Sequence, residues 1–344
     1  MIHIFTGAYN AEKTLDNAVK SILNQTYTNF RYYILDNGSI DSTKKIIEKY
    51  ANQDGRIIPV FKDSNRRGRF IEIMKDIFLE NSILTTSYFA CLDADDEYAP
   101  NFLEKMLGFI QENNLEVASC GTDWINEKTG EIIKKKVLEK NIILEGQNFA
   151  DQFPIYRNFM VTVWGCIYSL DLLQKCDFNW YYNTVNFSDT AFCMEVFHRA
   201  KRAGVLGDVL HKYYISPKTS SYKYNPDWFQ ACKYLNEISR EYLLDYGEIS
   251  NKNEDYLCVL FLINIKYILP RIQQANISLS EKLFNVRDIF ADDMTQHILK
   301  HWEEVGIHSS KLNFLHEIEE WIYSQDSWEK SHQTVEEIIK TMNI

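Results

Sequence analysis

Residues 88–96, YFACLDADD, lead from an apolar segment directly into three carboxylates. The apolar half predicts a buried β-strand, and the acidic half follows where that strand ends. Because residues i and i+2 of an extended chain point to the same side, Asp93 and Asp95 are predicted to face one cation together. Carboxylate oxygens suit Mg²⁺ or Mn²⁺ and leave coordination positions for water and phosphate oxygens. The alternative interpretation is an acidic turn that caps the helix opened by Pro100.

The pattern upstream of this segment alternates between strands and helices. Apolar runs predict strands at 2–6, 31–35 and 56–61, and helical spacing predicts helices over 11–23, 42–50 and 68–80. This alternation predicts a parallel α/β sheet, in which ligands bind beyond the carboxyl ends of the strands. The polar cluster Asp36-Asn37-Gly38-Ser39 follows the second strand and therefore occupies such an end, as do the carboxylates after the fourth.

The rest of the chain changes character twice. Strands are predicted at 115–120, 159–169 and 205–216, with a helix over 188–200. From about residue 225, apolar residues recur at helical spacing with charges between them. The predicted fold is therefore an α/β domain over 1–224, with halves 1–105 and 106–224, followed by an α-helical domain over 225–344.

Composition excludes several classes of protein. The 344 residues are 45% hydrophobic and 25% charged, the balance of a globular protein, and the net charge is −11. That charge is uneven, because residues 1–224 hold 26 basic and 28 acidic side chains, whereas residues 225–344 hold 11 and 20. Binding to nucleic acid through overall charge is not expected, and the acidic C-terminal third is poorly suited to anionic lipid.

Cysteine usage and hydropathy bear on the compartment. The seven cysteines form no CxxC pair and lie in apolar surroundings, which is typical of reduced core thiols. No signal peptide is evident, and the longest apolar run, Tyr256 to Ile263, is too short to span a bilayer. We therefore expect a cytoplasmic protein with no transmembrane segment, for which peripheral contact with the inner face of the membrane is allowed.

Four stretches occur in a fixed order: TGAYN (6–10), SILNQT (21–26), LDNGSID (35–41) and LDADDEYAP (92–100). Their order and spacing resemble family 2 glycosyltransferases of the GT-A fold, closely over 1–105 and loosely over 106–224. The resemblance implies a Rossmann-like nucleotide-sugar-binding domain with a mixed central sheet. It also implies a metal-dependent, usually inverting enzyme that uses nucleotide sugars. The segment 225–344 lies outside it.

The resemblance assigns roles to particular residues. It implies that Tyr9 lies against the nucleobase, where an aromatic face contributes roughly 1–3 kcal/mol. Nucleotide-sugar binding is expected from Thr6, Tyr9, Asp36, Asn37, Arg69, Asp93, Ala94 and Asp95. Asp93 and Asp95 would hold the metal, with His211 as a weaker third candidate. The structural alternatives are a tyrosine that plugs the sheet edge, a tight turn at 36–38 and a structural histidine.

A general base must take the proton from the acceptor hydroxyl. The resembled family places an aspartate at the start of a helix in the second half of the domain, and Asp189 in FSDTAF (187–192) fits that place. The alternative is an ordinary acid in the first turn of a helix, which complements the helix dipole.

The chain departs from the family pattern at several positions. Asn37 replaces the usual second aspartate, which leaves uridine and thymidine donors open, and Ser188 replaces the usual glutamate. The stretch NRRGR (65–69) stands near the place of the family's Arg-Asn-x-Gly run, so that Arg69 either reaches the diphosphate or belongs to a solvated basic loop. No Gln-x-x-Arg-Trp motif is present, which argues against a processive synthase.

The expected function is transfer of one hexose or N-acetylhexosamine from a UDP-sugar to a glycan or glycoprotein. Two other classes of protein are alternatives to this function. A nucleotidyltransferase would need a glycine-rich phosphate loop, and TGAYNAEK supplies one glycine. A catalytically degenerate partner protein would act through the helical C-terminus. That segment is expected to select the acceptor, to form a homodimer, or to do both.

Overall fold

The computed structural model describes residues 1–344 except 67–68, 80–85, 179–187, 216–223, 306–314 and 316–344. The chain forms two compact units, Met1–Ser216 and Pro217–Ile344. The predicted domain boundary after residue 224 falls shortly beyond this division. None of the helices among the described residues has the length and apolar character needed to cross a membrane.

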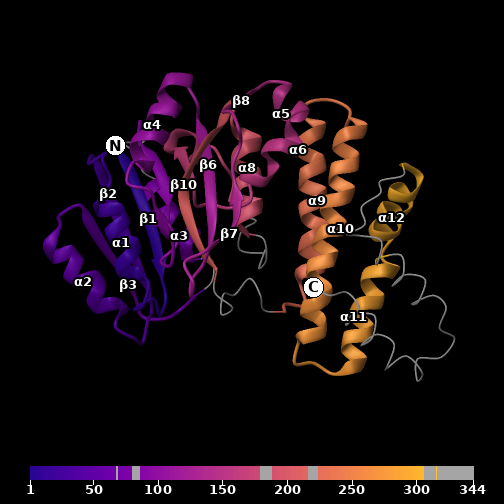
Figure 1. Ribbon diagram of the computed structural model, residues 1–344, viewed down its shortest axis with the longest axis horizontal. Helices are drawn as coiled ribbons and strands as arrows, with labels where there is room; N and C mark the ends of the chain where they lie inside the picture. Colours follow the sequence, from indigo (N-terminus) through magenta and orange to yellow (C-terminus); the bar gives the residue numbers. More distant parts are fainter. Residues whose placement is uncertain (67–68, 80–85, 179–187, 216–223, 306–314, 316–344) are drawn as a thin grey trace. The chain divides into compact units, whose positions relative to one another are not determined.

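A ten-stranded mixed sheet forms the centre of the first unit (Figure 1). Its strands are β1 (Ile2–Ala8), β2 (Phe30–Asn37), β3 (Ile57–Lys62), β4 (Tyr88–Cys91), β5 (Glu97–Tyr98), β6 (Val117–Asn126), β7 (Ile132–Lys136), β8 (Ile142–Glu145), β9 (Cys166–Ser169) and β10 (Arg202–Ile215). The order is β3-β2-β1-β4-β9-β6-β10-β5, with β7 paired to β6 and β8 to β10. The first four strands are parallel, as predicted, and β9 is antiparallel to both of its neighbours.

Helices cover both faces of this sheet. They are α1 (Leu15–Leu23), α2 (Thr43–Gln53), α3 (Arg69–Met74), the π-helical turn η1 (Lys75–Leu79), α4 (Phe102–Asn113), α5 (Asn148–Asp151), α6 (Phe153–Tyr156), the 3₁₀ turn η3 (Arg157–Phe159), α7 (Leu170–Leu173) and α8 (Ser188–Arg199). Apolar side chains of α1, α2 and α4 form one core with the sheet. On the other face, Phe70 of α3 contacts Phe5 of β1 and Phe192 of α8 through their rings.

The predicted strand over 159–169 is wrong except at its end. Only Cys166–Ser169 is a strand, and a 3₁₀ turn and an irregular segment precede it. Gly165 adopts a φ of 71°, and its amide donates a hydrogen bond to the Tyr98 hydroxyl at 3.2 Å. This apolar run is therefore buried without pairing, and periodicity alone does not separate a buried loop from a buried strand.

Four helices make up the described part of the second unit: α9 (Trp228–Leu244), α10 (Asn251–Gln274), α11 (Leu279–Ala291) and α12 (Asp293–Val305). Local sequence sets their starts. The Ser278 hydroxyl and the Glu281 carboxylate form a capping box at the start of α11, and Ser250 caps α10. The predicted helical C-terminal region is confirmed over the residues that the structure describes, from Trp228 to Val305. Of its tryptophans, Trp302 is buried in α12, whereas Trp321 and Trp328 lie outside the described residues.

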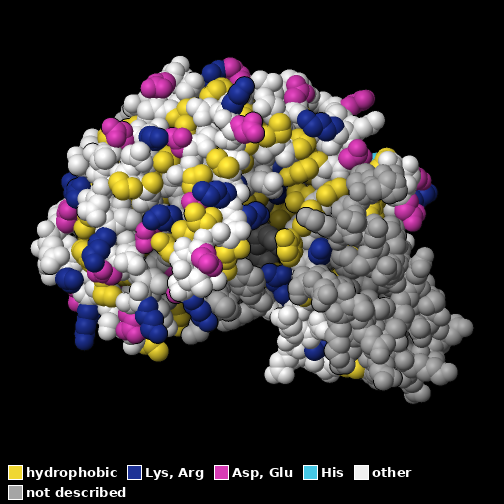
Figure 2. Space-filling view, in the orientation of Figure 1, with side chains coloured by type: hydrophobic (Ala, Val, Ile, Leu, Met, Phe, Trp, Pro, Cys, Tyr) yellow, Lys and Arg dark blue, Asp and Glu magenta, His cyan; other side chains and the backbone are white. Residues whose placement is uncertain are grey.

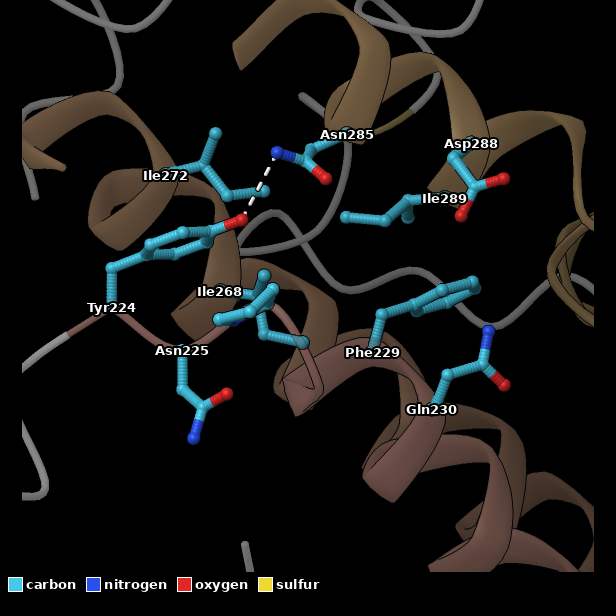
Figure 3. A pocket seen from close by; sticks show the side chains of 10 residues that line it. Tyr224, Asn225, Phe229, Gln230, Ile268, Ile272, Asn285, Asp288 and Ile289 are labelled. Carbon is cyan, nitrogen blue, oxygen red and sulfur yellow. Dashed lines mark hydrogen bonds between the residues drawn. The ribbon is translucent and has the colours of Figure 1, made fainter. Parts of the chain in front are cut away.

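A small cavity lies among α9, α10 and α11 (Figure 3). Its volume is about 40 Å³, and the Asn285 side-chain amide donates a hydrogen bond to the Tyr224 hydroxyl at 3.0 Å on its wall. A space of this size holds water rather than a sugar. Side chains of both charge signs are interspersed on the face of the first unit seen in Figure 2.

His3 gives the first unit a pH-dependent stability. Its ring is 2% exposed and contacts Tyr33 and Phe78, and neither nitrogen has a hydrogen-bond partner among the described residues. Burial lowers the pKa of His3 to about 4, so that the unfolded chain takes up a proton at a higher pH than the folded chain does. Stability due to the neutral ring is complete above pH 6.5 and is lost as the pH falls toward 4.

Wild type should lose unfolding free energy as the pH falls from 7 to 4, because of His3. His3→Phe lacks this titrating group, and we expect its loss over the same range to be smaller by up to about 3 kcal/mol. Urea unfolding at a series of pH values measures this difference. Equal pH dependence in the two proteins would show that His3 does not titrate in this range.

Candidate functional site

Parallel pairing brings three polar segments to one edge of the sheet. In the register, Ala8 of β1 lies beside Asp36 of β2, and Phe5 lies beside Cys91 of β4. The residues that follow these strands are therefore neighbours, as the sequence predicts. Tyr9 directly follows β1, and its side chain is 46% exposed at this edge.

The turn after β2 is held by its own side chains. Asp36 is 3% exposed, and its Oδ1 accepts a hydrogen bond from the Ser39 amide at 2.9 Å. Gly38 has a φ of 79°, and a Cβ there would lie 2.6 Å from the Ser64 backbone. The Asn37 amide nitrogen donates to the Asn65 Oδ1 at 2.9 Å and to a backbone carbonyl beside it. Asn37 therefore fixes the loop after β3, and that role uses both donors of its side chain.

The turns after β1 and β2 are tied to each other. Asn10 has a φ of 51°, a left-handed conformation that asparagine tolerates. The backbone N–H of Asn10 donates to the Ser39 Oγ at 3.0 Å, and the side-chain Oδ1 of Asn10 accepts from the backbone N–H of Ile40, also at 3.0 Å. These bonds position Tyr9 relative to the turn that holds Asp36.

Thr6 lies beneath this edge and is fully buried. Its hydroxyl donates to the Leu92 carbonyl at 2.8 Å and accepts from the Tyr32 hydroxyl at 2.9 Å. In this structure the hydroxyl therefore links β1 and β2 to the start of the acidic turn, and it does not face the open edge.

We expect Thr6→Val to lower the free energy of unfolding by about 1–3 kcal/mol, because the buried Tyr32 hydroxyl and Leu92 carbonyl both lose their partner. Thr6→Ser keeps the hydroxyl and serves as the control. Chemical denaturation measures both variants, and a Thr6→Val protein as stable as Thr6→Ser would contradict this assignment.

The acidic turn brings three carboxylates together. One oxygen of each of Asp93, Asp95 and Asp96 lies within 4.8 Å of the other two. The turn closes through the Asp96 amide, which donates to the Asp93 carbonyl at 3.2 Å. Asp96 is buried, and its Oδ1 accepts from the Tyr214 amide at 2.9 Å, whereas its Oδ2 has no hydrogen-bond partner in the part of the chain that the structure describes. Ala94 is buried between the two aspartates predicted to bind the ligand.

The electrostatics of this turn favour a bound cation. Burial raises the pKa of Asp93 well above its usual value, and the charges of Asp96, Asp95 and Asp189 add to this shift. Burial also raises the pKa of Asp96, and desolvation by neighbouring protein atoms raises the pKa of Asp95 although its side chain is exposed. In the described part of the chain, no lysine or arginine forms an ion pair with these three carboxylates. Oxygen donors, mutual repulsion and the unpartnered Asp96 Oδ2 fit a divalent cation such as Mn²⁺ or Mg²⁺.

His211 is fully buried behind the acidic turn. Its Nε2 lies 3.4 Å from the Asp96 Oδ2, and its ring stacks on Trp164 with a centroid separation of 4.4 Å. Burial lowers the pKa of His211 well below its usual value and keeps the imidazole neutral, the form that a metal requires. The predicted role of His211 as a third ligand stays a prediction.

Asp189 lies at the second position of α8. The residue is open to solvent on one side, yet the protein atoms around its carboxyl group desolvate it and raise its pKa to about 6. It is near enough to the acidic turn for its charge to raise the pKa of Asp93. An acid that served only the helix dipole would have a lowered pKa, so this shift favours a carboxylate poised for proton transfer.

One predicted residue of the site has no described side chain, and three residues at the site were not predicted from the sequence. Arg69 begins α3, but its side chain lies outside the described ones. Asp96 is visible in the sequence as the third acid of the turn, although no separate role follows from the motif. Trp164 and Tyr214 reach the site only through strand pairing, for which a single sequence offers no signal.

The mixed sheet, with an acidic turn at the end of its parallel half and a helix-borne carboxylate beside it, is the GT-A fold of the glycosyltransferases. The family described as Glycosyl transferase family 2 matches residues 4–175. The chain therefore belongs to glycosyltransferase family 2.

Comparisons with individual proteins agree with this assignment. An uncharacterized glycosyltransferase of Haemophilus influenzae is 27% identical over 259 residues, which cover 71% of this chain and 75% of the relative. The uncharacterized glycosyltransferase YibD of Escherichia coli is 24% identical over 246 residues, covering 68% and 70%. The crystal structure of residues 1–349 of S. aureus TarS with UDP superimposes with a TM-score of 0.61 at 15% identity, covering 88% and 87% of the two chains. The curated relatives identify the chain as a glycosyltransferase, and the TarS likeness supports its fold.

Proposed function

We propose that this enzyme transfers a single hexose or N-acetylhexosamine from a UDP-sugar to a hydroxyl of a glycan or glycoprotein, with inversion at the anomeric carbon. One observation carries the proposal. The Asp189 carboxylate, with its raised pKa, lies within electrostatic reach of the acidic turn at Asp93. A base beside a diphosphate site is the arrangement that direct displacement by a hydroxyl needs.

The donor side is supported by the geometry of the strand ends. Tyr9 presents an exposed ring, and Asp36 is held at the adjacent turn by the Ser39 amide. TarS, which shares this fold, has been crystallised with UDP and with UDP-GlcNAc. We infer that a uracil base packs on the Tyr9 ring and that the Asp36 side chain contacts the base or the ribose. Because Asn37 is committed to the loop after β3, we assign it to positioning that loop.

The chain's own residues divide the chemical work. Asp93 and Asp95 would hold the divalent cation, with Asp96 and His211 behind them. When bound, such a cation neutralises the diphosphate as it departs. Asp189 accepts the proton of the acceptor hydroxyl, which makes the oxygen nucleophilic.

Thermal unfolding with nucleotides tests the proposal. We expect UDP and one UDP-sugar to raise the unfolding midpoint with Mn²⁺ and not with EDTA, because binding to the folded state adds about 2.7 kcal/mol at a hundred times Kd. GDP and dTDP are the matched controls for the base. No shift with any nucleotide would contradict the proposal and favour a partner protein that acts through its helices.

A further inference from the structure

The lysines of β7 are divided between two environments. Successive residues of a strand point to opposite faces, so Lys134 and Lys136 share one face and Lys135 occupies the other. The Lys135 ammonium pairs with the Asp123 carboxylate at 3.5 Å. No carboxylate among the described residues pairs with Lys134 or Lys136.

Aromatic rings lie beside both of these ammonium groups, one ring beside Lys134 and three beside Lys136. The Lys134 Nζ lies 4.9 Å from the centroid of the Trp124 ring. The Lys136 Nζ lies 5.7 Å from Trp124, 5.1 Å from Phe159 and 5.3 Å from Trp164. Burial lowers the pKa of Lys136, as expected for a desolvated cation without a counterion. Lysines that only protect a sheet edge from pairing are exposed to water, as Lys134 and Lys135 are, whereas Lys136 is half-buried against three rings.

This aromatic cluster is continuous with the acidic turn. The Trp164 ring stacks on His211 and, at 5.3 Å, on Tyr213, which in turn meets Trp124 edge-on at 6.2 Å. The His211 Nε2 in turn lies 3.4 Å from the Asp96 Oδ2, without a hydrogen bond between them. Trp164 is buried, whereas Tyr213 and Trp124 are half-buried, so these three rings form a wall that leads from the proposed metal site to the lysine pair and is open to solvent at Tyr213 and Trp124.

We propose that this wall is the acceptor subsite and that the acceptor is an anionic glycan, with a sugar beside the Trp124 and Tyr213 rings and a phosphate or carboxylate on Lys136 and Lys134. Aromatic faces supply the apolar platform and ammonium groups the point charges that such a ligand needs. The inference rests on the proposed function, since an acceptor subsite presupposes transfer.

Binding of three polymers to the full chain tests it: poly(glycerol phosphate), polyglucuronic acid and neutral dextran. The protein is saturated with UDP and Mn²⁺ so that the donor site is filled, and Kd is measured by calorimetry. We expect at least one anionic polymer to bind about tenfold more tightly than dextran. Tighter binding of poly(glycerol phosphate) would identify phosphate as the anionic group of the acceptor, and tighter binding of polyglucuronic acid would identify carboxylate.

Matched variants assign the effect to the proposed face. Lys136→Met is expected to abolish the preference for the polyanion, Lys136→Arg to keep it, and Lys135→Met, on the opposite face, to leave it unchanged. If Lys136→Met fails to fold, Lys134→Met replaces it and is likewise expected to abolish the preference for the polyanion over dextran. Equal binding of all three polymers, or an unchanged preference in Lys136→Met, would overturn the inference. Loss of UDP binding with polyanion binding retained would instead count against the proposed function.

Discussion

Asp189→Asn is expected to reduce sugar transfer by about a thousandfold while UDP binding stays within about twofold of wild type. The amide occupies the same space at the start of α8 but cannot accept the proton of the acceptor hydroxyl. Steady-state transfer and calorimetry with UDP and Mn²⁺ measure the two effects separately.

Asp171→Asn is the matched control for this variant. Asp171 is likewise an acid in the first turn of a helix, α7, where it pairs with Lys175 at 2.5 Å on the surface. An acid that only complements the helix dipole contributes to stability and not to turnover, so Asp171→Asn should transfer sugar at the wild-type rate. Full activity in Asp189→Asn would show that the base lies elsewhere.

The pH dependence of the wild-type enzyme follows from the same carboxylate. Desolvation raises the pKa of Asp189 to about 6, so the carboxylate is protonated below that pH. A general base acts in its ionised form, and kcat/KM is therefore expected to be level above about pH 7 and to fall about tenfold per pH unit below 6. A rate that stays level down to pH 4.5 would exclude a base with this pKa.

The residues that the sequence identified are those whose roles follow from local order along the chain. Apolar runs and turns located the parallel strands, and the carboxyl ends of parallel strands meet by geometry. For this reason the Tyr9, Asp36 and Asp93 segments could be predicted to converge. Asp189 could be placed because one motif marks the start of its helix, although its raised pKa depends on protein atoms packed around it.

What the sequence could not show depends on pairing between distant strands. The insertion of β9 antiparallel between β4 and β6 brings Trp164 over His211, and no local signal encodes that pairing. Asn37 was expected to contact the nucleotide because its motif neighbours do. Its bonds to the loop after β3 depend on a contact across 28 residues. Lys136 is one of three successive lysines in the sequence, and only the pairing of β7 with β6 places it beside three rings.

Asp95→Asn is expected to raise the stability of the metal-free protein and to weaken metal-dependent binding of UDP. Protein atoms beside the exposed Asp95 side chain, together with the Glu127 charge, raise the pKa of its carboxyl group, so the ionised form destabilises the fold slightly near neutral pH, by an amount that solvent screens. The uncharged amide removes that cost, and we expect the variant in EDTA to unfold at a higher temperature than wild type. The same change removes a ligand, so the Kd for UDP with Mn²⁺ should rise about a hundredfold, equivalent to roughly 3 kcal/mol.

Opposite signs in the two measurements distinguish a metal ligand from a residue that merely supports the turn. Loss of a supporting residue would lower the unfolding temperature and weaken UDP binding together. Asp208→Asn, which removes an exposed carboxylate paired with Lys105 at 2.6 Å, is the control and should change neither UDP binding nor its dependence on Mn²⁺. If Asp95→Asn binds UDP with unchanged dependence on Mn²⁺, Asp95 is not a ligand, and the cation would be assigned to Asp93 and Asp96 of the same turn.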